Sequence, residues 1–188
     1  MINYGAASLR ETTGTSGLDQ TLRNAVSTLA ECDIPHFVVG GLAVQEHGYY
    51  RVTLDVDIVV PDVLDAAEML TADLAGPFAR VPGCEDTVKD RHNNVLVNLL
   101  PAGRVPRRDC QIPFPTPTEV SSSPVIISLT DLISLKLDSW SHSPTRRLKD
   151  KADVVELIAR GHLPRDLAVQ PPVRQIYEET WDALQAEK

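Results

Sequence analysis

The chain changes several times between short apolar runs and helical spacing before it becomes helical throughout. Apolar runs rich in β-branched residues predict strands over 36–39, 51–60 and 94–100. Apolar positions three and four residues apart predict helices over 18–31, 42–47, 63–74, 130–140, 145–160 and 172–186. Prolines and glycines predict loops over 76–92 and 104–124, with one edge strand at 110–112. This order predicts an α/β (α+β) fold, a mixed sheet flanked by helices and followed by a helical C-terminal part.

Length and composition favour a single domain. The chain has 188 residues, of which 43% are hydrophobic, so it can bury a core without disulfide or metal staples. We expect a flexible lead-in over 1–16, the α/β core over 17–125, and the helical part packed on that core over 126–188.

The cysteines and the net charge indicate the cellular compartment of the protein and the kinds of partner that it can bind. The three cysteines are scattered and form no C-x-x-C pair, which favours a reducing compartment and predicts neither a disulfide framework nor a thiolate zinc site. The N-terminus lacks the pattern of a signal peptide, and no apolar run reaches the ~18 residues of a membrane span. We therefore expect a soluble cytoplasmic protein without membrane contact. A formal net charge of −8 argues against broad affinity for nucleic-acid backbones.

Two carboxylates interrupt the second apolar run. Alternation along a strand places Asp55 and Asp57 on one side, together with Arg51, and the apolar residues on the other. Carboxylates at i and i+2 bring their oxygens close enough to hold one or two hard divalent cations. The alternative is an edge strand whose polar side meets water.

A glycine pair precedes these acids. Gly40 and Gly41 follow the strand at 36–39 and let the backbone turn sharply into a helix, where exposed N–H groups are suited to a phosphate. An ordinary tight turn is the alternative. The turn, the short helix and the D-x-D strand would place a phosphate cradle and metal carboxylates in one short segment.

These motifs carry a family resemblance. The segment VVGGLAVQEHGYYRVTLDVDIVV resembles the nucleotidyltransferase fold of the DNA polymerase beta superfamily. It is particularly similar to AbiEii-like bacterial members, which read Gly-Gly and then Arg-x-Thr-x-Asp-x-Asp. The downstream stretches SLTDLISLKLDSW and RRLKDKADVVELI also look like later helices of that family, so the resemblance covers about residues 36–158.

The resemblance implies transfer of a nucleoside monophosphate from an NTP to an acceptor, dependent on Mg²⁺ or Mn²⁺. Asp55 and Asp57 would hold the metals, because in-line displacement between two cations fits closely placed carboxylates. The implied catalytic residues are Asp55, Asp57, Asn98 and Lys136. The implied nucleotide contacts are Gly40, Gly41, Arg51, Thr53 and Asp150.

Position 98 departs from the family pattern. Where these enzymes carry a third carboxylate in a stretch like Val-Asp-Leu-Leu, this chain has Asn98. An amide ligates Mg²⁺ weakly and cannot accept the acceptor's proton, which weakens the prediction of catalysis. Asn98 is equally interpreted as a hydrogen-bonded residue at a strand end. Glu85, Asp90 and Asp109 are alternative third carboxylates.

Two basic residues have alternative interpretations as well. Lys136 lies at the border of an apolar helical stripe, where it either reaches water or contacts the triphosphate or the aspartate cluster. Arg51 is expected to pair with Asp57 or a neighbouring acid, and nucleotide contact is the lesser alternative.

The sequence therefore predicts a nucleotidyltransferase whose acceptor is tRNA, a protein or a small molecule. Among its forms we include the toxin of a toxin–antitoxin pair, which would have a cognate antitoxin as partner. The alternative is a catalytically impaired protein of the same fold that binds a nucleotide or a partner, which Asn98 would explain directly.

Overall fold

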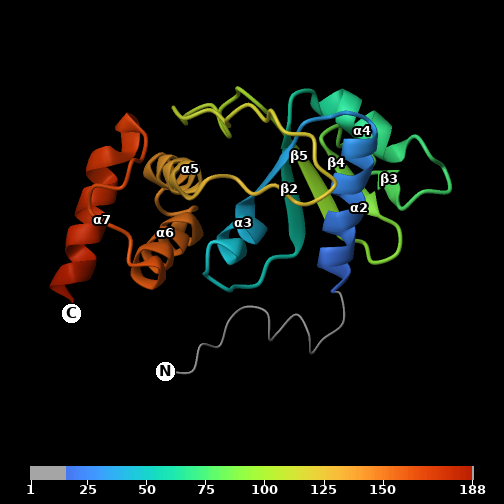
Figure 1. The fold of residues 1–188 in the computed structure, drawn as a ribbon. Helices are drawn as coiled ribbons and strands as arrows, with labels where there is room; N and C mark the ends of the chain where they lie inside the picture. Colours follow the sequence, from blue (N-terminus) through green and yellow to red (C-terminus); the bar gives the residue numbers. More distant parts are fainter. Residues whose placement is uncertain (1–15, 188) are drawn as a thin grey trace.

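One five-stranded sheet organises the chain, and helices cover it (Figure 1). The computed structural model describes residues 16–187. Its strands are β1 (Phe37–Val39), β2 (Asp55–Val60), β3 (Phe78–Arg80), β4 (Thr87–Asp90) and β5 (Leu96–Pro101). Its helices are α2 (Gly17–Glu31), α3 (Gly40–Glu46), α4 (Val63–Thr71), α5 (Leu129–Ser141), α6 (Leu148–Gly161), the 3₁₀ helix η1 (Pro171–Val173) and α7 (Arg174–Ala186). The predicted mixed α/β fold is confirmed.

The sheet is mixed, with the strand order β1-β2-β5-β4-β3. β2 and β5 run parallel, whereas the other neighbouring strands are antiparallel. The parallel register places Asp57 directly opposite Asn98. The D-x-D motif of β2 and the unusual Asn98 of β5 are therefore neighbours at the centre of the sheet.

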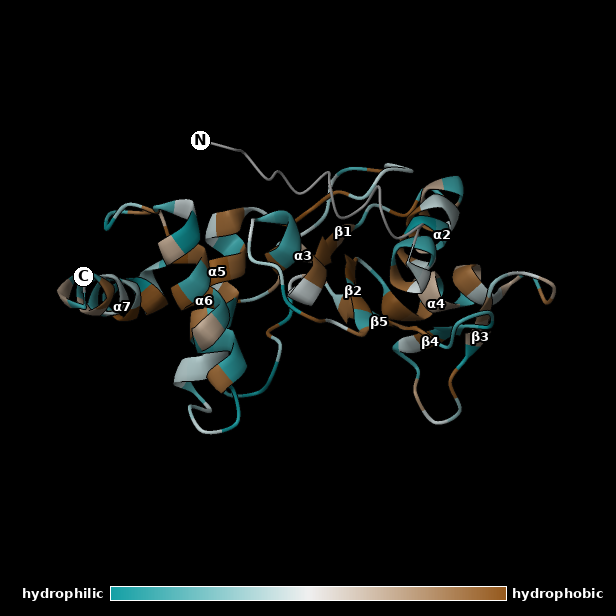
Figure 2. Cartoon of the chain, turned by 90° about the horizontal axis from the view of Figure 1, so that it is seen from below, coloured by the Kyte–Doolittle hydropathy of each residue, from teal (hydrophilic) through white to brown (hydrophobic). Residues whose placement is uncertain are grey.

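Two apolar clusters pack against the sheet. Side chains of α2 and α4 join Val56 and Ile58 of β2 in one cluster, and side chains of α5 and α6 join Val59 in the other. Figure 2 shows β1, β2 and β5 as a largely hydrophobic layer between these groups of helices. Because side chains alternate along β2, Asp55 and Asp57 point to the same side as Val59, toward α5 and α6.

The predicted helices are confirmed with small shifts at their ends. α2 begins after Ser16, whose hydroxyl accepts the backbone N–H of Asp19 at 3.2 Å. Asp62 caps α4 in the same way. α4 ends at Thr71, so the prediction that it reaches Leu74 is wrong. Leu74 is 84% exposed and thus has no core to hold it in a helix.

One strand prediction is too long. The predicted strand over 51–60 begins only at Asp55, because β5 starts at Leu96, directly opposite Asp55. Residues 51–54 consequently have no neighbouring strand with which to form ladder hydrogen bonds.

Other strand predictions are also wrong, because one expected strand is irregular and two strands formed where a loop was expected. The edge strand expected at 110–112 is irregular, and it packs as a loop through the buried side chain of Ile112. The segment 76–92, predicted as a loop, contains β3 and β4. These strands have three and four residues, which is too short for an alternating pattern to stand out.

Most of the lead-in predicted over 1–16 lies outside the described residues, and Ser16 is its only described member. Among the helices within 16–187, none combines the length and the apolar character needed to cross a membrane.

Candidate functional site

Asp55 and Asp57 are partly buried and have neutral hydrogen-bond donors. Thr53 Oγ1 donates to Asp55 Oδ1 at 3.0 Å, and Asn98 Nδ2 donates to Asp57 Oδ1 at 2.9 Å. Within residues 16–187, neither carboxylate forms an ion pair with a Lys or Arg. Two acids of like charge therefore lie side by side without a direct ion pair to any described Lys or Arg, although the charges of Lys136 and Arg51 lower the pKa of Asp57 from a distance.

The environment of Asp57 disfavours its charged form. Burial is the largest influence and raises the pKa of its carboxyl above the ordinary value of 3.8. The hydrogen bond from Asn98 lowers this pKa, and the negative charge of Asp55 raises it again. A cation bound beside Asp57 would offset both the loss of solvent and the repulsion from Asp55.

The backbone at the glycine pair lies against these residues. α3 begins at Gly40 rather than at Leu42, and Gly40 has a φ of 67°, in the left-handed region. A Cβ atom at Gly40 would overlap Asp57 Oδ2, and one at Gly41 would overlap the hydroxyl of Thr53. Both positions therefore require glycine because the backbone approaches the polar side chains of 53–57 so closely.

Arg51 and Lys136 both bind Asp153 of α6. Arg51 Nε and Nη2 donate to the two oxygens of Asp153 at 2.6 and 2.8 Å. Lys136 Nζ lies 2.7 Å from Asp153 Oδ2 and donates to Asp150 Oδ1 at 3.1 Å. Arg51 therefore pairs with an acid, as expected, but that acid is Asp153 and not Asp57. Residue 51 precedes the strand, so its side chain does not follow the alternation of β2 and reaches α6 instead.

The ion-pair network of Arg51, Lys136 and Asp153 is largely buried. The side chains of Asp153, Lys136 and Arg51 are 1%, 8% and 14% exposed. Burial alone would raise the pKa of Asp153, but the hydrogen bond from Arg51 and the charge of Lys136 outweigh burial and lower that pKa. Lys136 therefore reaches acids inside the protein rather than water, but these acids belong to α6 and are not the aspartates of β2.

A cavity of about 550 Å³ brings several predicted residues together. Gly40, Asp57, Lys136 and Asp150 line it from α3, β2, α5 and α6. Asp55 is the next residue on the same side of β2. The predicted site residues outside this lining are Gly41, Arg51, Thr53, Asp55 and Asn98.

Three charged residues of this cavity were not predicted as site residues. They are Asp86, Arg107 and Arg147. Asp86 directly precedes β4, so its position follows from a strand that the sequence pattern did not reveal. Arg107 is held by its hydrogen bond to the carbonyl oxygen of Ser139, at 2.6 Å, which fixes an otherwise irregular segment against α5. A lysine and two arginines thus line one cavity with Asp57.

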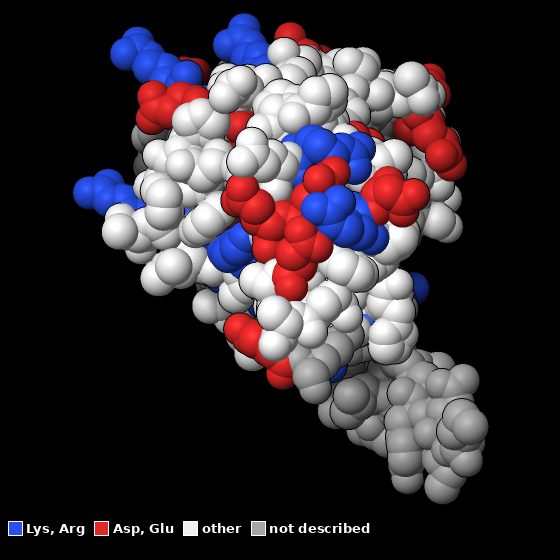
Figure 3. Space-filling model, turned by 90° about the vertical axis from the view of Figure 1, so that its left-hand side faces the viewer, with Lys and Arg blue, Asp and Glu red and all other residues white. Residues whose placement is uncertain are grey.

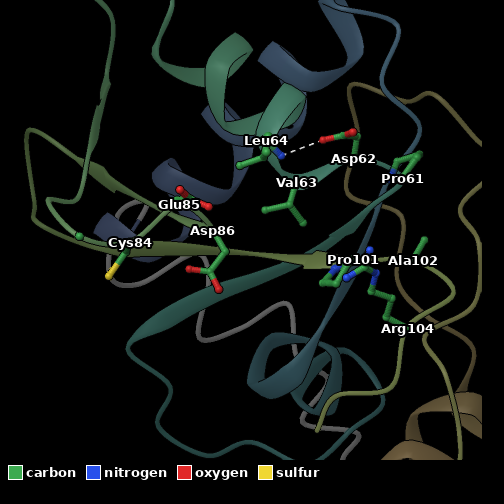
Figure 4. A pocket seen from close by; sticks show the side chains of 11 residues that line it. Pro61, Asp62, Val63, Leu64, Cys84, Glu85, Asp86, Pro101, Ala102 and Arg104 are labelled. Atoms are coloured by element: carbon green, nitrogen blue, oxygen red, sulfur yellow. Dashed lines mark hydrogen bonds between the residues drawn. The ribbon is translucent and has the colours of Figure 1, made fainter. Parts of the chain in front are cut away.

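A second cavity, of about 910 Å³, adjoins the first at Asp86 and Pro101, which line both. Figure 4 shows its lining, with Glu85 and Asp86 on the strand side and Arg104 near Ala102. Its charged residues are Asp62, Glu85, Asp86 and Arg104. The second cavity is therefore more acidic than the first.

The alternative third carboxylates lie in different places. Asp90 is fully buried, and its oxygens accept hydrogen bonds from the hydroxyl of Thr21 and the backbone N–H of His92. Asp109 is exposed and lines neither cavity, and Glu85 lines only the second. Asp90 and Asp109 are thus wrong as candidates, because their positions separate them from Asp57.

Comparisons with known proteins bear on the fold. No family model and no curated protein matches the sequence. A nucleotidyltransferase-like antigenic protein from Paracoccidioides brasiliensis is similar in structure, with a TM-score of 0.52 and 17% identity over 90% of this chain and 89% of the other. ANT(2'')-Ia in complex with adenylyl-2''-tobramycin has a TM-score of 0.49 and 14% identity, over 89% of this chain and 97% of the other.

The CCA-adding enzyme of Thermotoga maritima, complexed with tRNA, has a TM-score of 0.44 and 18% identity, over 97% of this chain and 46% of the other. The fold argument rests on the Paracoccidioides protein, whose likeness extends over nearly all of both chains. The specific resemblance to AbiEii-like members stays a prediction. The mixed sheet, the helices around it and this likeness show that the chain has the nucleotidyltransferase fold.

Proposed function

We propose that the protein transfers a nucleoside monophosphate from an NTP to an acceptor and requires Mg²⁺ or Mn²⁺. The observation that carries the proposal is the placement of Asp55 and Asp57 on one side of β2, with Asp57 lining a cavity that Lys136 also lines. A metal-bound triphosphate requires carboxylates for the metal and cationic side chains for the phosphates, both at one cavity.

The donor set at β2 fits a hard divalent cation. Asp55 and Asp57 offer carboxylate oxygens, the ligands that Mg²⁺ prefers, whereas Asn98 on the neighbouring strand turns its amide nitrogen toward Asp57. The raised pKa of Asp57 supports the assignment because a cation would relieve its unfavourable surroundings. When bound, the cation would neutralise developing charge on the phosphates.

The cationic residues of the first cavity are assigned to the triphosphate. The ammonium of Lys136 has three N–H donors, of which Asp150 and Asp153 engage two, so one remains for a phosphate oxygen. Arg107 and Arg147 line the same cavity and supply further positive charge.

Asp86 is assigned the role that Asn98 cannot perform. A carboxylate can take the proton of an attacking hydroxyl, and an amide cannot. Asp86 lines both cavities, so an acceptor in the second cavity would meet the nucleotide in the first beside this carboxylate.

For the acceptor we propose a cationic small molecule. A volume of about 910 Å³ lies in the range of small-molecule sites, and three carboxylates against one guanidinium favour positive charge. The net charge of −8 disfavours tRNA. On the side where α7 lies, Figure 3 shows acidic side chains interspersed with the basic ones. Arg165, for example, pairs there with Asp182 and Glu178 of α7.

The test is transfer from each α-labelled NTP, with Mg²⁺ or Mn²⁺, to a panel of polyamines, aminated sugars, tRNA and cell extract. Label on a cationic small molecule supports the whole proposal, and label on tRNA or protein retains the chemistry but overturns the acceptor. Absence of label with every NTP overturns the transferase. Asp86→Asn should lower kcat by about 10²–10⁴-fold, whereas Glu85→Gln, beside it in the second cavity only, should not.

One observation favours a second candidate, a protein of this fold that binds nucleotide without transferring it. The hydrogen bond from Asn98 occupies one oxygen of Asp57 and supplies no charge for a second metal. Saturable NTP binding without any labelled product would support this candidate. The toxin role and its antitoxin stay predictions, which growth arrest on expression would test.

A further inference from the structure

A second group of metal-ligating side chains lies outside the lining of both cavities. Cys110, Asp138 and His142 each place one ligand atom within 4.8 Å of the other two. Asp138 lies in the last turn of α5, His142 is the C-cap residue four positions later, and Cys110 comes from the irregular segment that follows β5. The group is thus made by long-range packing and not by a local motif, and sequence spacing predicted no thiolate zinc site here.

Asp138 is the buried centre of the group, and its two oxygens differ. Oδ2 accepts the backbone N–H groups of Gln111 and Ile112 at 2.9 and 3.0 Å. Oδ1 is buried and has no hydrogen-bond donor among residues 16–187, and the residue as a whole is only 1% exposed. Buried carboxylate oxygens are normally satisfied by a donor or a cation, so Oδ1 indicates a missing ligand.

The imidazole of His142 is close to that oxygen but is oriented elsewhere. Its Nδ1 lies 3.3 Å from Asp138 Oδ1 and 2.9 Å from the backbone oxygen of Asp138, which accepts the better hydrogen bond. A separation of ~3.3 Å is what two ligand atoms show when each lies ~2.0 Å from a tetrahedral ion. The spacing fits a shared metal once Nδ1 has given up its proton, and with it the hydrogen bond to the backbone oxygen of Asp138.

We propose that Cys110, Asp138 and His142 bind one Zn²⁺ ion, with water as the fourth ligand. Thiolate, imidazole and carboxylate together form a donor set that Zn²⁺ accepts and that Mg²⁺ does not favour. Cys110 is 6% exposed, and the side chain of His142 is 25% exposed, so the group is enclosed but reachable from solvent.

The ion would fasten the irregular segment to α5. Arg107, three residues before Cys110, donates to the backbone oxygen of Ser139 on the same helix. Zinc would thus hold this segment at a second point, independently of the carboxylates on β2. Removal of zinc should lower the melting temperature even if the proposed transferase activity does not exist.

The test is titration of the metal-free full chain with Co²⁺ and with Zn²⁺ alone. Binding should produce a thiolate-to-cobalt charge-transfer band, and Zn²⁺ should displace the cobalt and raise the melting temperature. Cys110→Ser should abolish the charge-transfer band, and His142→Gln should weaken metal binding by at least about 10- to 100-fold. Cys32→Ser and Cys84→Ser, which change exposed cysteines, should behave like the wild type.

Two outcomes would overturn the proposal. One is a wild-type protein that shows neither the thiolate band nor a stability response to Zn²⁺. The other is a band that persists in folded Cys110→Ser and disappears in Cys84→Ser, because the thiolate ligand would then lie elsewhere. If Cys110→Ser does not fold, His142→Gln still tests the site, because unchanged metal affinity in that variant would overturn the proposal.

Discussion

Asn98 donates its side-chain amide to Asp57 at 2.9 Å, across the parallel strands β5 and β2. From the family that the sequence resembles, we expect an acid at this position, where it would complete a three-carboxylate centre. The amide stabilises the ionised form of Asp57 but adds no negative charge for a cation. If the proposed metal site holds a second cation, the chemistry of this pair would decide how strongly that cation is bound.

Asn98→Asp should tighten divalent-metal binding in the presence of nucleotide and raise transfer. The change replaces a donor by a near-isosteric carboxylate, so without metal it should cost about 1–3 kcal/mol of stability through repulsion from Asp57. Thermal melting with and without Mg²⁺ and NTP, together with the transfer assay, measures both effects. Unchanged metal dependence would mean that Asn98 lies outside the metal site.

Asp55→Asn and Asp57→Asn should each weaken binding of Mg²⁺ with a nonhydrolysable NTP, because each removes a negative ligand oxygen. Isothermal titration gives the affinities. Asp65→Asn is the matched control, since Asp65 is exposed on α4 and lines neither cavity. Wild-type affinity in both folded site variants would remove the central claim.

Gly40→Ala should cost more stability than Gly83→Ala and should also reduce nucleotide binding. Both glycines have positive φ, so either alanine carries a backbone cost of about 1–2 kcal/mol. Only at Gly40 would the new Cβ meet Asp57, whereas Gly83 has open space around it. Denaturant melts of the two variants isolate the contact, and equal losses would contradict it.

Asp153→Asn should destabilise the protein by about 3–5 kcal/mol, because Arg51 and Lys136 would keep buried charges without their shared partner. Glu156→Gln on the same helix removes only the exposed pair with Arg160 and should cost about 0.3–0.5 kcal/mol. Urea denaturation compares them. A loss as small as that of the control would show that the network contributes little.

Affinity for Mg²⁺ should rise as pH increases through the folded pKa of Asp57. Burial raises that pKa above its ordinary value, and only the ionised carboxylate binds the cation. The folded chain then binds this proton more tightly than the unfolded chain. Stability of the metal-free protein should therefore decline as pH rises from the unfolded pKa through the folded one. Titrations in Asp57→Asn should lose this pH dependence.

The sequence predicted the strand β2 and its acids better than it predicted which residues pack around them. The alternation from Asp55 to Val60 and the glycine pair are local signals, because a strand and a tight turn depend on neighbouring residues. Asn98 was predicted through a short motif, and the register of β5 brought it opposite Asp57.

The parts that could not be predicted depend on contacts between distant segments. Asp86 enters the cavity through β4, a strand of four residues whose existence depends on pairing with β5. Arg51 can reach Asp153 because residues 51–54 lie outside β2. No local sequence pattern indicates that the strand begins only at Asp55. Tertiary packing overrides strand propensity at both places.

The pairing of Arg51 with Asp153 joins residues 102 positions apart in the chain. During synthesis, the glycine pair and both acids of β2 leave the ribosome before the helix that carries Asp153 exists. At typical elongation rates the interval between Arg51 and Asp153 is roughly 5–20 s. A nascent chain thus presents these acids before α6 can complete the first cavity, so the nucleotide binding that we propose should appear only late in translation.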